Sequence, residues 1–407
     1  MLERFKYRPD IDGLRGVAVL LVVIFHIFPE AIVGGFIGVD IFFVISGYLI
    51  TSIIIKNLHC QSFSFTRFYL RRIKRKFPAL VIVLLCSSLF SLFALYPIEL
   101  LSFKKHLLGG VLFASNIISL YENSYFDIAS QNKPLLHLWS LGIEEQFYLV
   151  WPFLLFLTFR KKVRFSFVIL MLAITSFFLN ICTVYGDNTV AFFSPLCRFW
   201  ELMVGGFVAS LEAKNGGGRN RFTCNLLSVT GAAFLFCSLV FVKDKSTFPG
   251  WLALLPTLGA AFVIAGGAES LLGRCLSHRG VVWIGLISYP LYLWHWPLIS
   301  FYQTIYGAMP AYSERFGIVF FSLFLAWLTF LYIEQPIRYG VGRAASRHLI
   351  PVGLGMILAG FFGCSFYSSK SQPAGAQEIL EPGVKGETKK ILLVGDSHAD
   401  HLFAGLE

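Results

Sequence analysis

The sequence predicts an all-α, multi-pass membrane protein, and three observations support this fold class. Apolar runs of about 18 residues or more recur along the chain, and a helix of that length can cross a bilayer. The 407 residues are 56% hydrophobic and only 14% charged, with a mean hydropathy of +0.69. The runs are continuous and do not alternate between polar and apolar residues, so we expect helices and not the strands of a membrane barrel.

Eleven apolar segments are predicted to span the membrane, and one further apolar stretch is not. That stretch, residues 103–120, is interrupted by a Gly-Gly pair and carries a Lys-Lys-His run near its start. We expect it to be a non-spanning or re-entrant helix within a long external segment, residues 97–143. The predicted spans are residues 11–28, 36–55, 77–96, 144–159, 165–183, 195–212, 223–242, 251–268, 281–305, 314–333 and 349–367.

Basic residues determine the expected orientation of these spans. Lys and Arg are concentrated in every second loop, whereas the loops at residues 29–35, 184–194 and 306–312 contain none. Because cytoplasmic loops are enriched in Lys and Arg, we expect the N-terminus in the cytoplasm and the C-terminus outside it. The net charge of +11 then reflects topology, and no nucleic-acid partner is expected.

The first predicted span contains two residues that do not belong in hydrocarbon, Arg15 and His26. They are eleven positions apart, which places them on the same helix face and about 16 Å apart along the axis. Ionisable residues within a span are energetically costly and mark a candidate functional site. The pair suits a site reached from one membrane face, with a cation near the entrance and an imidazole deep inside. The alternative is that Arg15 is an interfacial anchor and His26 a packed, hydrogen-bonded helix residue.

Other predicted spans also carry ionisable residues within them or at their ends. They are Asp40 at the outer end of 36–55, Arg71, Arg72 and Arg75 at the inner end of 77–96, Glu144 and Glu145 at the outer start of 144–159, Glu201 at the outer start of 195–212, and His295 within 281–305. For each acid, a structural salt bridge or a role at a helix N-terminus is an open alternative. The basic cluster could be only a topology determinant, and His295 is interpreted as a packed, hydrogen-bonded ring rather than a second catalyst.

Six segments combine these residues into recognisable motifs. They read GGFIGVDIFFVISGYLIT from Gly34, FYLRRIKRKFPAL from Phe68, PLLHLWSLGIEEQFYLVWP from Pro134, FFSPLCRFWELMVGG from Phe192, WIGLISYPLYLWHWPL from Trp283 and YIEQPIR from Tyr332. Together with the Arg-x10-His element formed by Arg15 and His26, they resemble the acyltransferase-3 family of integral-membrane O-acyltransferases. The resemblance covers about residues 7–340.

The C-terminal residues resemble the start of a second domain. The last predicted span is followed by a linker rich in Ser, Gly, Pro, Glu and Lys, and then by KILLVGDSHADHLFAGLE from Lys390. This stretch predicts a strand, a tight turn and the start of a helix, and its Gly-Asp-Ser-His tetrad resembles the first block of the SGNH domains fused to some acyltransferase-3 proteins. Ser397 would be the nucleophile there, poorly activated because the later SGNH blocks with its His partner are absent. The expected organisation is a ten-span acyltransferase domain at 1–340, a linking eleventh span at 341–368, a linker at 369–389 and the first fragment of a truncated α/β SGNH-like domain at 390–407.

The resemblance implies a membrane O-acyltransferase in an inner (cytoplasmic) membrane of bacterial type. Acyl-CoA, expected to be acetyl-CoA, would donate an acyl group to a hydroxyl of an extracytoplasmic carbohydrate, such as lipopolysaccharide O-antigen or another surface polysaccharide. Besides donor and acceptor, the expected partners are membrane lipids. No metal is expected, because the eight cysteines form no Cys-x-x-Cys pair.

The same resemblance suggests roles for the candidate residues. Arg71, Arg72 and Arg75 would hold the donor phosphates through charge-assisted hydrogen bonds. His26 would be the general base or a transient acyl carrier, because imidazole has an unperturbed pKa near working pH. Arg15 would steady the thioester arm. The acids would orient His26 or line the outward half of a path through the helices.

A proton-coupled secondary transporter is the alternative function, with Arg15, His26 and the acids forming a substrate path. The sequence has no paired broken helices and no convincing internal repeat, both of which are common in such transporters. Turnover of acetyl-CoA by the purified protein would distinguish the two functions.

Overall fold

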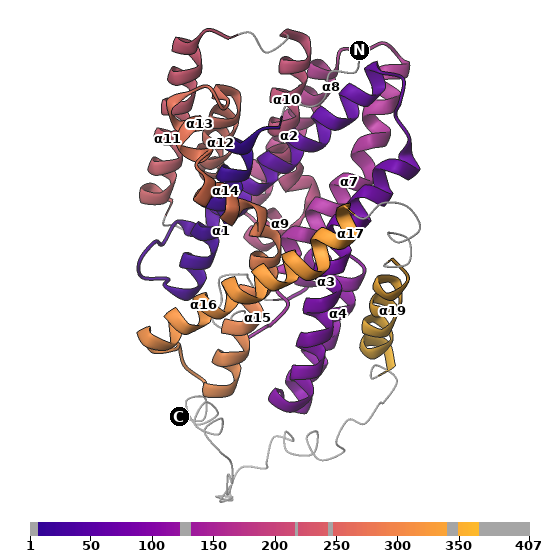
Figure 1. Ribbon diagram of the computed structural model, residues 1–407, viewed down its shortest axis with the longest axis vertical. Helices are drawn as coiled ribbons and strands as arrows, with labels where there is room; N and C mark the ends of the chain where they lie inside the picture. Colours follow the sequence, from indigo (N-terminus) through magenta and orange to yellow (C-terminus); the bar gives the residue numbers. More distant parts are fainter. Residues whose placement is uncertain (1–6, 123–131, 216–218, 243–246, 340–348, 366–407) are drawn as a thin grey trace, which may run out of the picture. The chain divides into compact units, whose positions relative to one another are not determined.

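The chain is organised as a bundle of helices (Figure 1). The computed structural model describes residues 7–122, 132–215, 219–242, 247–339 and 349–365. Within these residues there is no strand, and all of them belong to one compact unit, Met1–Phe366. The helices are α1 (Pro9–Ile27), η1 (Gly35–Ile37), α2 (Gly38–His59), α3 (Phe65–Ala94), α4 (Pro97–Val111), α5 (Ser115–Leu120), α7 (Leu138–Arg160), α8 (Phe165–Val184), α9 (Asn188–Phe193), α10 (Pro195–Asn215), α11 (Arg221–Phe241), η2 (Trp251–Ala253), α12 (Leu254–Gly266), α13 (Leu271–Leu276), α14 (Arg279–Leu286), α15 (Ser288–Tyr306), α16 (Tyr312–Thr329), the π-helical turn η3 (Phe330–Glu334), α17 (Gln335–Tyr339) and α19 (Leu349–Ser365).

Helices α1 and α3 carry most of the candidate cations, and the local sequence explains where each of them begins. Helix α1 has Pro9 in its first turn, where the missing N–H has no intrahelical partner to lose, and Asp10 and Asp12 there favour the positive end of the helix dipole. Helix α3 begins after Ser64, whose hydroxyl accepts a hydrogen bond from the backbone N–H of Arg67 at 3.4 Å. The basic cluster therefore lies inside α3 and not in a loop before it.

Glycines allow two central helices to approach closely. Helix α2 packs along α10, and α10 also packs on α8. A Cβ atom on Gly47 would lie 1.7 Å from the carbonyl oxygen of Leu202, and one on Gly205 would lie 1.9 Å from that of Val44. Only a residue without a side chain fits such backbone contacts, as in the small-residue interfaces of membrane helices. The contact brings Asp40 of α2 next to α10.

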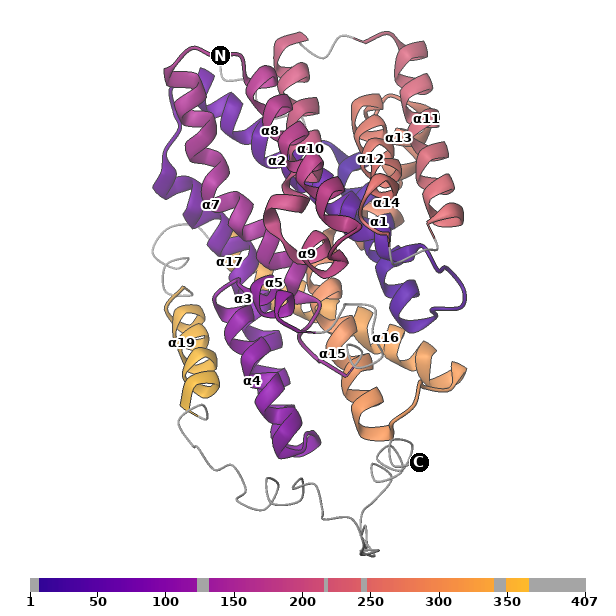
Figure 2. The same cartoon turned by 180° about the vertical axis from the view of Figure 1, so that it is seen from behind.

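Helix α1 packs within the bundle, and two further groups of helices lie on other sides. Helix α1 contacts α2, α14 and α15, so Arg15 and His26 lie on a helix with several helical neighbours. Helix α11 packs on α12 and α13 on one side of the bundle, and α19 packs on α3 and α4 on another (Figures 1 and 2).

The helices agree with a multi-pass membrane protein. Among the described residues, five helical stretches are long and apolar enough to cross a membrane, judged by length and composition: Gly35–His59, Phe65–Ala94, Phe165–Val184, Arg221–Phe241 and Tyr312–Arg338. The ten-span count of the acyltransferase domain remains a prediction.

Four predicted segments differ clearly from the observed helices. Helix α7 begins at Leu138, six residues before the predicted span 144–159. Helix α3 begins twelve residues before the predicted span 77–96, because a helix tolerates the Lys and Arg side chains that lower hydropathy. The stretch 103–120 breaks after Val111 and not at its Gly-Gly pair, giving α4 and α5. The predicted span 281–305 is divided at Ile287 into α14 and α15. The SGNH-like fragment at 390–407, with Ser397, lies outside the described residues.

Candidate functional site

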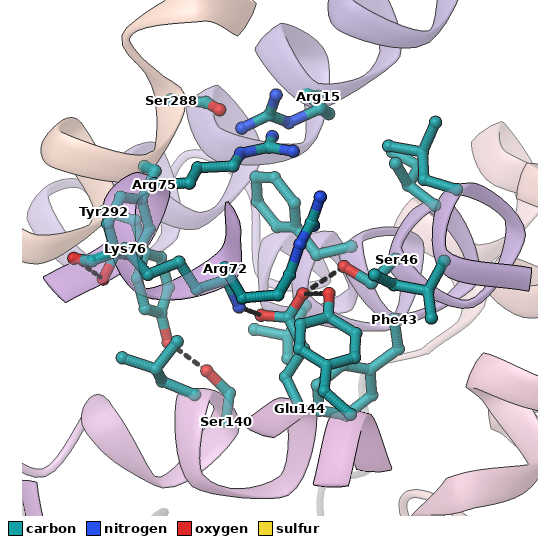
Figure 3. A pocket seen from close by; sticks show the side chains of 18 residues that line it. Arg15, Phe43, Ser46, Arg72, Arg75, Lys76, Ser140, Glu144, Ser288 and Tyr292 are labelled. Atoms are coloured by element: carbon teal, nitrogen blue, oxygen red, sulfur yellow. Dashed lines mark hydrogen bonds and ion pairs between the residues drawn. The ribbon is translucent and has the colours of Figure 1, made fainter. Parts of the chain in front are cut away.

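A pocket between α1, α2, α3, α7 and α15 collects many of the polar side chains that the sequence singled out (Figure 3). The guanidinium groups of Arg15, Arg72 and Arg75 gather on one side of it, and Ser140 lies on the opposite side. The cavity measures about 80 Å³, which suits a slender group and not a nucleotide. The polar lining residues are Arg15, Ser46, Arg72, Arg75, Lys76, Ser140, Glu144, Tyr148, Ser288, Tyr289 and Tyr292.

The four cations of the pocket are neutralised to different degrees. Lys76 lies 2.7 Å from a carboxylate oxygen of Glu144 and 2.7 Å from one of Glu145. Arg15 pairs with Asp12 of its own helix at 3.2 Å. Arg72 and Arg75 make no hydrogen bond or ion pair within the described part of the chain, and the Nε of Arg72 is buried. The pocket therefore offers guanidinium groups whose hydrogen-bond donors are unused among the described residues, which favours an anionic ligand.

Glu144 is the centre of a hydrogen-bond network. Its carboxylate accepts hydrogen bonds from the hydroxyls of Ser46 and Tyr148 and pairs with Lys76. This contact corrects one expectation, which placed Glu144 at the outer start of 144–159 and the basic cluster at the inner end of 77–96. Lys76, which follows that cluster directly, touches Glu144 inside the bundle, so the two groups cannot lie at opposite membrane faces. The acid lies two turns into α7 and Lys76 more than three turns into α3, so the two helices bring both charges to one level.

The three arginines of the predicted donor-binding cluster do not all line the pocket. Arg72 and Arg75 line it, whereas Arg71 is exposed and lines a separate surface hollow with Arg67 and Lys74. At 100° per residue, Arg71 is about 100° from Arg72 but only about 40° from Arg75, so it lies at the edge of the face that carries the other two. Arg71 is therefore not a pocket residue.

Three histidines meet beyond the Ser140 side of the pocket. The hydroxyls of Ser140 and Tyr292 lie 2.7 Å apart, and that of Tyr292 donates to the carbonyl oxygen of His137 at 2.8 Å. The ring of His295 lies 5.5 Å from that of Tyr292 and 6.0 Å from that of His137. His26 reaches the same cluster from α1, with its Nδ1 3.0 Å from Nε2 of His295. Tyr292 thus touches both the pocket and the histidine cluster.

The other predicted acids form a separate buried group. Arg198 lies 3.1 Å from a carboxylate oxygen of Asp40 and 2.8 Å from one of Glu201, and the exposed fraction of each side chain is 1% or less. Its guanidinium also lies over the rings of Phe43, Trp139, Phe192 and Phe248. These contacts match the structural alternative for Asp40 and Glu201, because neither acid lines the pocket or touches His26.

Sequence reasoning singled out Arg15, Arg72, Arg75, Glu144 and His26 but missed residues that complete the site. The missed residues are Ser46, Lys76, His137, Ser140 and Tyr292. His137 stands seven residues before Glu144 and Tyr292 three before His295, so each is close to a predicted site residue on the same motif. Residues three, four or seven positions from a predicted site residue lie on the same helix face, and this spacing could have identified His137 and Tyr292.

Comparison with known proteins places most of the chain in one family. A family model described as an acyltransferase domain matches residues 8–333. O-acetyltransferase OatA of Staphylococcus aureus (strain NCTC 8325 / PS 47) is 32% identical over 350 residues, which cover 82% of this chain and 57% of that protein. Peptidoglycan O-acetyltransferase OatA of Listeria monocytogenes is 32% identical over 384 residues, which cover 87% of this chain and 61% of that protein. The chain thus spans about three fifths of the length of these relatives. No solved structure matches it.

Proposed function

Because the chain belongs to the acyltransferase-3 family, we propose that it is a membrane O-acetyltransferase that takes its acyl group from acetyl-CoA. The acceptor in this proposal is a hydroxyl of a carbohydrate outside the cytoplasm. Two relatives carry O-acetyltransferase in their names, which supports acetyl as the transferred group. One of them is named for peptidoglycan, so a cell-wall glycan replaces lipopolysaccharide as the first acceptor to test.

The observation that carries the proposal is the pair of pocket arginines, Arg72 and Arg75, whose hydrogen-bond donors are unused among the described residues. Acyl-CoA is anionic through its phosphates, and planar guanidinium groups bind phosphate through paired, charge-assisted hydrogen bonds. Arg72 and Arg75 have no partner among the described residues, so both can turn their donors toward a ligand. Arg15 lies on the same side of the pocket.

The cavity suggests how the donor is divided between the two ends of the site. Its volume of about 80 Å³ admits a slender arm, so the nucleotide would stay near the arginines while the thioester arm extends toward Ser140 and Tyr292. His26 lies about 16 Å farther along α1 than Arg15. With the N-terminus in the cytoplasm, the arginines would face the cytoplasmic donor and the histidines would lie nearer the acceptor.

His26 would carry the transfer step. As a general base, its ring nitrogen takes the acceptor's hydroxyl proton while the hydroxyl oxygen attacks the thioester carbon. As a transient carrier, the same nitrogen attacks that carbon first and passes the acyl group on. In both routes the acyl C–S bond is replaced by an acyl C–O bond, and the hydroxyl proton finally balances the released thiolate.

The test uses the purified protein in detergent or nanodiscs with acetyl-CoA and soluble peptidoglycan fragments. Release of free CoA and acetylated glycan are both measured, with His26→Ala as the inactive reference and His59→Gln as a matched control on the exposed end of α2. Loss of the base should lower turnover by about 10²–10⁴-fold. A protein that never consumes acetyl-CoA, but moves a solute with protons in vesicles, would instead be a transporter.

A further inference from the structure

One buried hydroxyl of the pocket has no hydrogen-bond partner in the described part of the chain. It belongs to Ser288, which is completely buried and lines the pocket at the start of α15. Buried polar groups are nearly always hydrogen-bonded, because leaving one unpaired costs free energy. The hydroxyl of Ser288 therefore requires a partner that the described residues do not supply.

The break between α14 and α15 explains why this hydroxyl is unpaired. Other buried serines, such as Ser88 and Ser322, donate at 2.7 Å to the carbonyl oxygen of the residue four positions earlier in the same helix. The residue four positions before Ser288 is Ile284, which lies in α14, on the other side of the break at Ile287. Ser288 makes no such bond, so its hydroxyl is left to the pocket.

Close packing of α14 on α1 places Ser288 near the guanidinium groups of the pocket. A Cβ atom on Gly285 would lie 1.7 Å from the carbonyl oxygen of Asp12, so the two helices touch through their backbones. Ser288 follows Gly285 by three residues, and Arg15 follows Asp12 by three. Figure 3 shows Ser288 on the same side of the pocket as Arg15 and Arg75. A hydroxyl and two guanidinium groups therefore line the same part of the pocket.

The start of α15 adds to the preference of this part of the pocket for an anion. The first N–H groups of a helix have no acceptor within it, and the helix dipole is positive at this end. Helix α15 is 19 residues long, and the hydroxyl of Tyr289 donates to the carbonyl oxygen of Lys76 at 3.0 Å, which fixes its start against α3. A hydroxyl, guanidinium groups and a helix N-terminus together suit a phosphate group.

We propose that Ser288 is a donor-binding residue whose hydroxyl, beside Arg15, holds the phosphate to which the pantetheine arm of acetyl-CoA is attached. The inference rests on the proposed function and deepens it, because it assigns one phosphate of the donor to one place in the pocket. The hydroxyl donates a hydrogen bond to a phosphate oxygen. Among the described residues Arg15 contacts Asp12 through one terminal nitrogen, and a guanidinium has five N–H donors in all.

The size of the cavity determines which phosphate reaches Ser288. A cavity of about 80 Å³ admits the slender arm and excludes the nucleotide. The phosphate next to the arm can therefore approach a buried lining residue. The phosphate on the ribose is separated from the arm by the rest of the nucleotide and stays outside the cavity.

The binding test measures the Kd of purified variants for three acetylated ligands by isothermal titration calorimetry. Acetyl-CoA has the arm-linked phosphate and the nucleotide, acetyl-4′-phosphopantetheine has that phosphate without the nucleotide, and acetyl-pantetheine has no phosphate. We expect Ser288→Ala to raise the Kd of both phosphate-containing ligands by a similar factor of about 10 or more, because each loses one hydrogen bond to a charged group. The Kd of acetyl-pantetheine should not change.

Thermal unfolding without ligand separates this binding role from a structural one. Ser288→Ala removes a hydroxyl that has no partner among the described residues, so the unfolding midpoint should stay the same or rise. Ser322→Ala is the matched control, because it removes a buried, hydrogen-bonded hydroxyl of α16 that does not line the pocket. It should lower the midpoint and leave all three Kd values unchanged. An equal fall of the midpoint in Ser288→Ala would overturn the inference.

A second variant, Ser288→Asp, should change stability and binding in opposite directions. A carboxylate at the start of α15 and beside Arg15 should raise the unfolding midpoint of the free protein, because it meets the positive end of the helix dipole and a guanidinium. The same carboxylate repels a phosphate, so acetyl-CoA should bind more weakly than to Ser288→Ala. Acetyl-CoA binding as tight as in the wild type would contradict a phosphate at this place.

The two proposals fail in distinguishable ways. If Ser288→Ala keeps the wild-type Kd for acetyl-CoA while Arg72→Ala raises it, a water molecule is the partner of the hydroxyl, and the inference fails while the proposed function stands. An equal loss for acetyl-pantetheine would place the hydroxyl against the arm and also overturn the inference. If the wild type neither binds nor consumes acetyl-CoA, the proposed function fails, and the role of Ser288 fails with it.

Discussion

Two neighbouring cations of α3, Arg72 and Lys76, should respond to removal in opposite ways. Arg72 lines the pocket without a partner among the described residues, whereas Lys76 holds two carboxylates at 2.7 Å. We expect Arg72→Ala to leave the free energy of unfolding nearly unchanged, because no ion pair is broken and repulsion from Arg75 is relieved. Lys76→Ala should destabilise the fold by about 3–5 kcal/mol, because it leaves Glu144 and Glu145 buried without a counter-charge.

Donor binding should show the reverse order of effects. A hydrogen bond to a charged group contributes about 1.5–3 kcal/mol, and each 1.4 kcal/mol is a tenfold change in Kd. Arg72→Ala should therefore raise the Kd for acetyl-CoA roughly 10- to 100-fold. Arg71→Ala is the matched control, because the same change one residue earlier falls on the exposed face of α3. It should alter the Kd less than twofold.

The assay is isothermal titration calorimetry of the purified variants, together with their thermal unfolding in the same detergent. Acetyl-pantetheine, which lacks the nucleotide and its phosphates, separates phosphate binding from binding of the arm. Its affinity should be weak and insensitive to Arg72→Ala. An Arg72→Ala protein that binds acetyl-CoA as tightly as wild type, or an equal loss in Arg71→Ala, would refute the assignment of the phosphate site.

Three further predictions concern topology and stability. A reporter that is active only outside the cytoplasm should be on when fused after Gly186 and off after Arg164; the opposite pattern would invert the predicted orientation. Arg198→Met should destabilise the protein by about 3–5 kcal/mol in chemical denaturation, because two buried carboxylates lose their counter-charge, and a loss below 1 kcal/mol would contradict this. Partial burial opposes ionisation of Glu122, but hydrogen bonds and charges from His106 and Lys133 lower its pKa to about 2. Relative to Glu122→Gln, the stabilisation should be complete above the unfolded pKa of about 4.3 and disappear as the pH falls toward 2, which thermal midpoints from pH 2 to 7 would measure.

The sequence predicts where the helices lie along the chain far better than it predicts which face of each helix lines the site. Apolar runs locate α8 and α11 within two residues, because a long continuous run has no other stable conformation in a bilayer. The start of α3 was misplaced because Lys and Arg lower hydropathy without breaking a helix. Helical rotation alone leaves Arg71 only about 40° from Arg75, so its absence from the pocket depends on which helices pack against α3.

Contacts between helices that are far apart in the sequence could not be predicted from the sequence. The shared face of Arg15 and His26 follows from their spacing on one helix, but the His26–His295 contact depends on how α1 packs against α15. The same holds for Lys76 and Glu144, which charge patterning alone assigns to opposite membrane faces. The ion pair inside the bundle offsets the cost of burying the two charges. Neither residue shows in the sequence that it has a buried partner, because each stands where a span was predicted to end or begin.

The two ends of the site differ in their polar groups, and this difference would give the proposed transfer a direction. At the arginine end, Arg72 and Arg75 have guanidinium donors without a partner among the described residues, so a phosphate would gain charge-assisted hydrogen bonds there. At the other end, the ring of His295 lies within hydrogen-bond distance of the carbonyl oxygen of Tyr292 and of His26. In the proposed reaction an uncharged thioester arm would extend from the arginines into the narrow cavity. The charged part of the donor would then stay at one end while only its reactive group approaches His26.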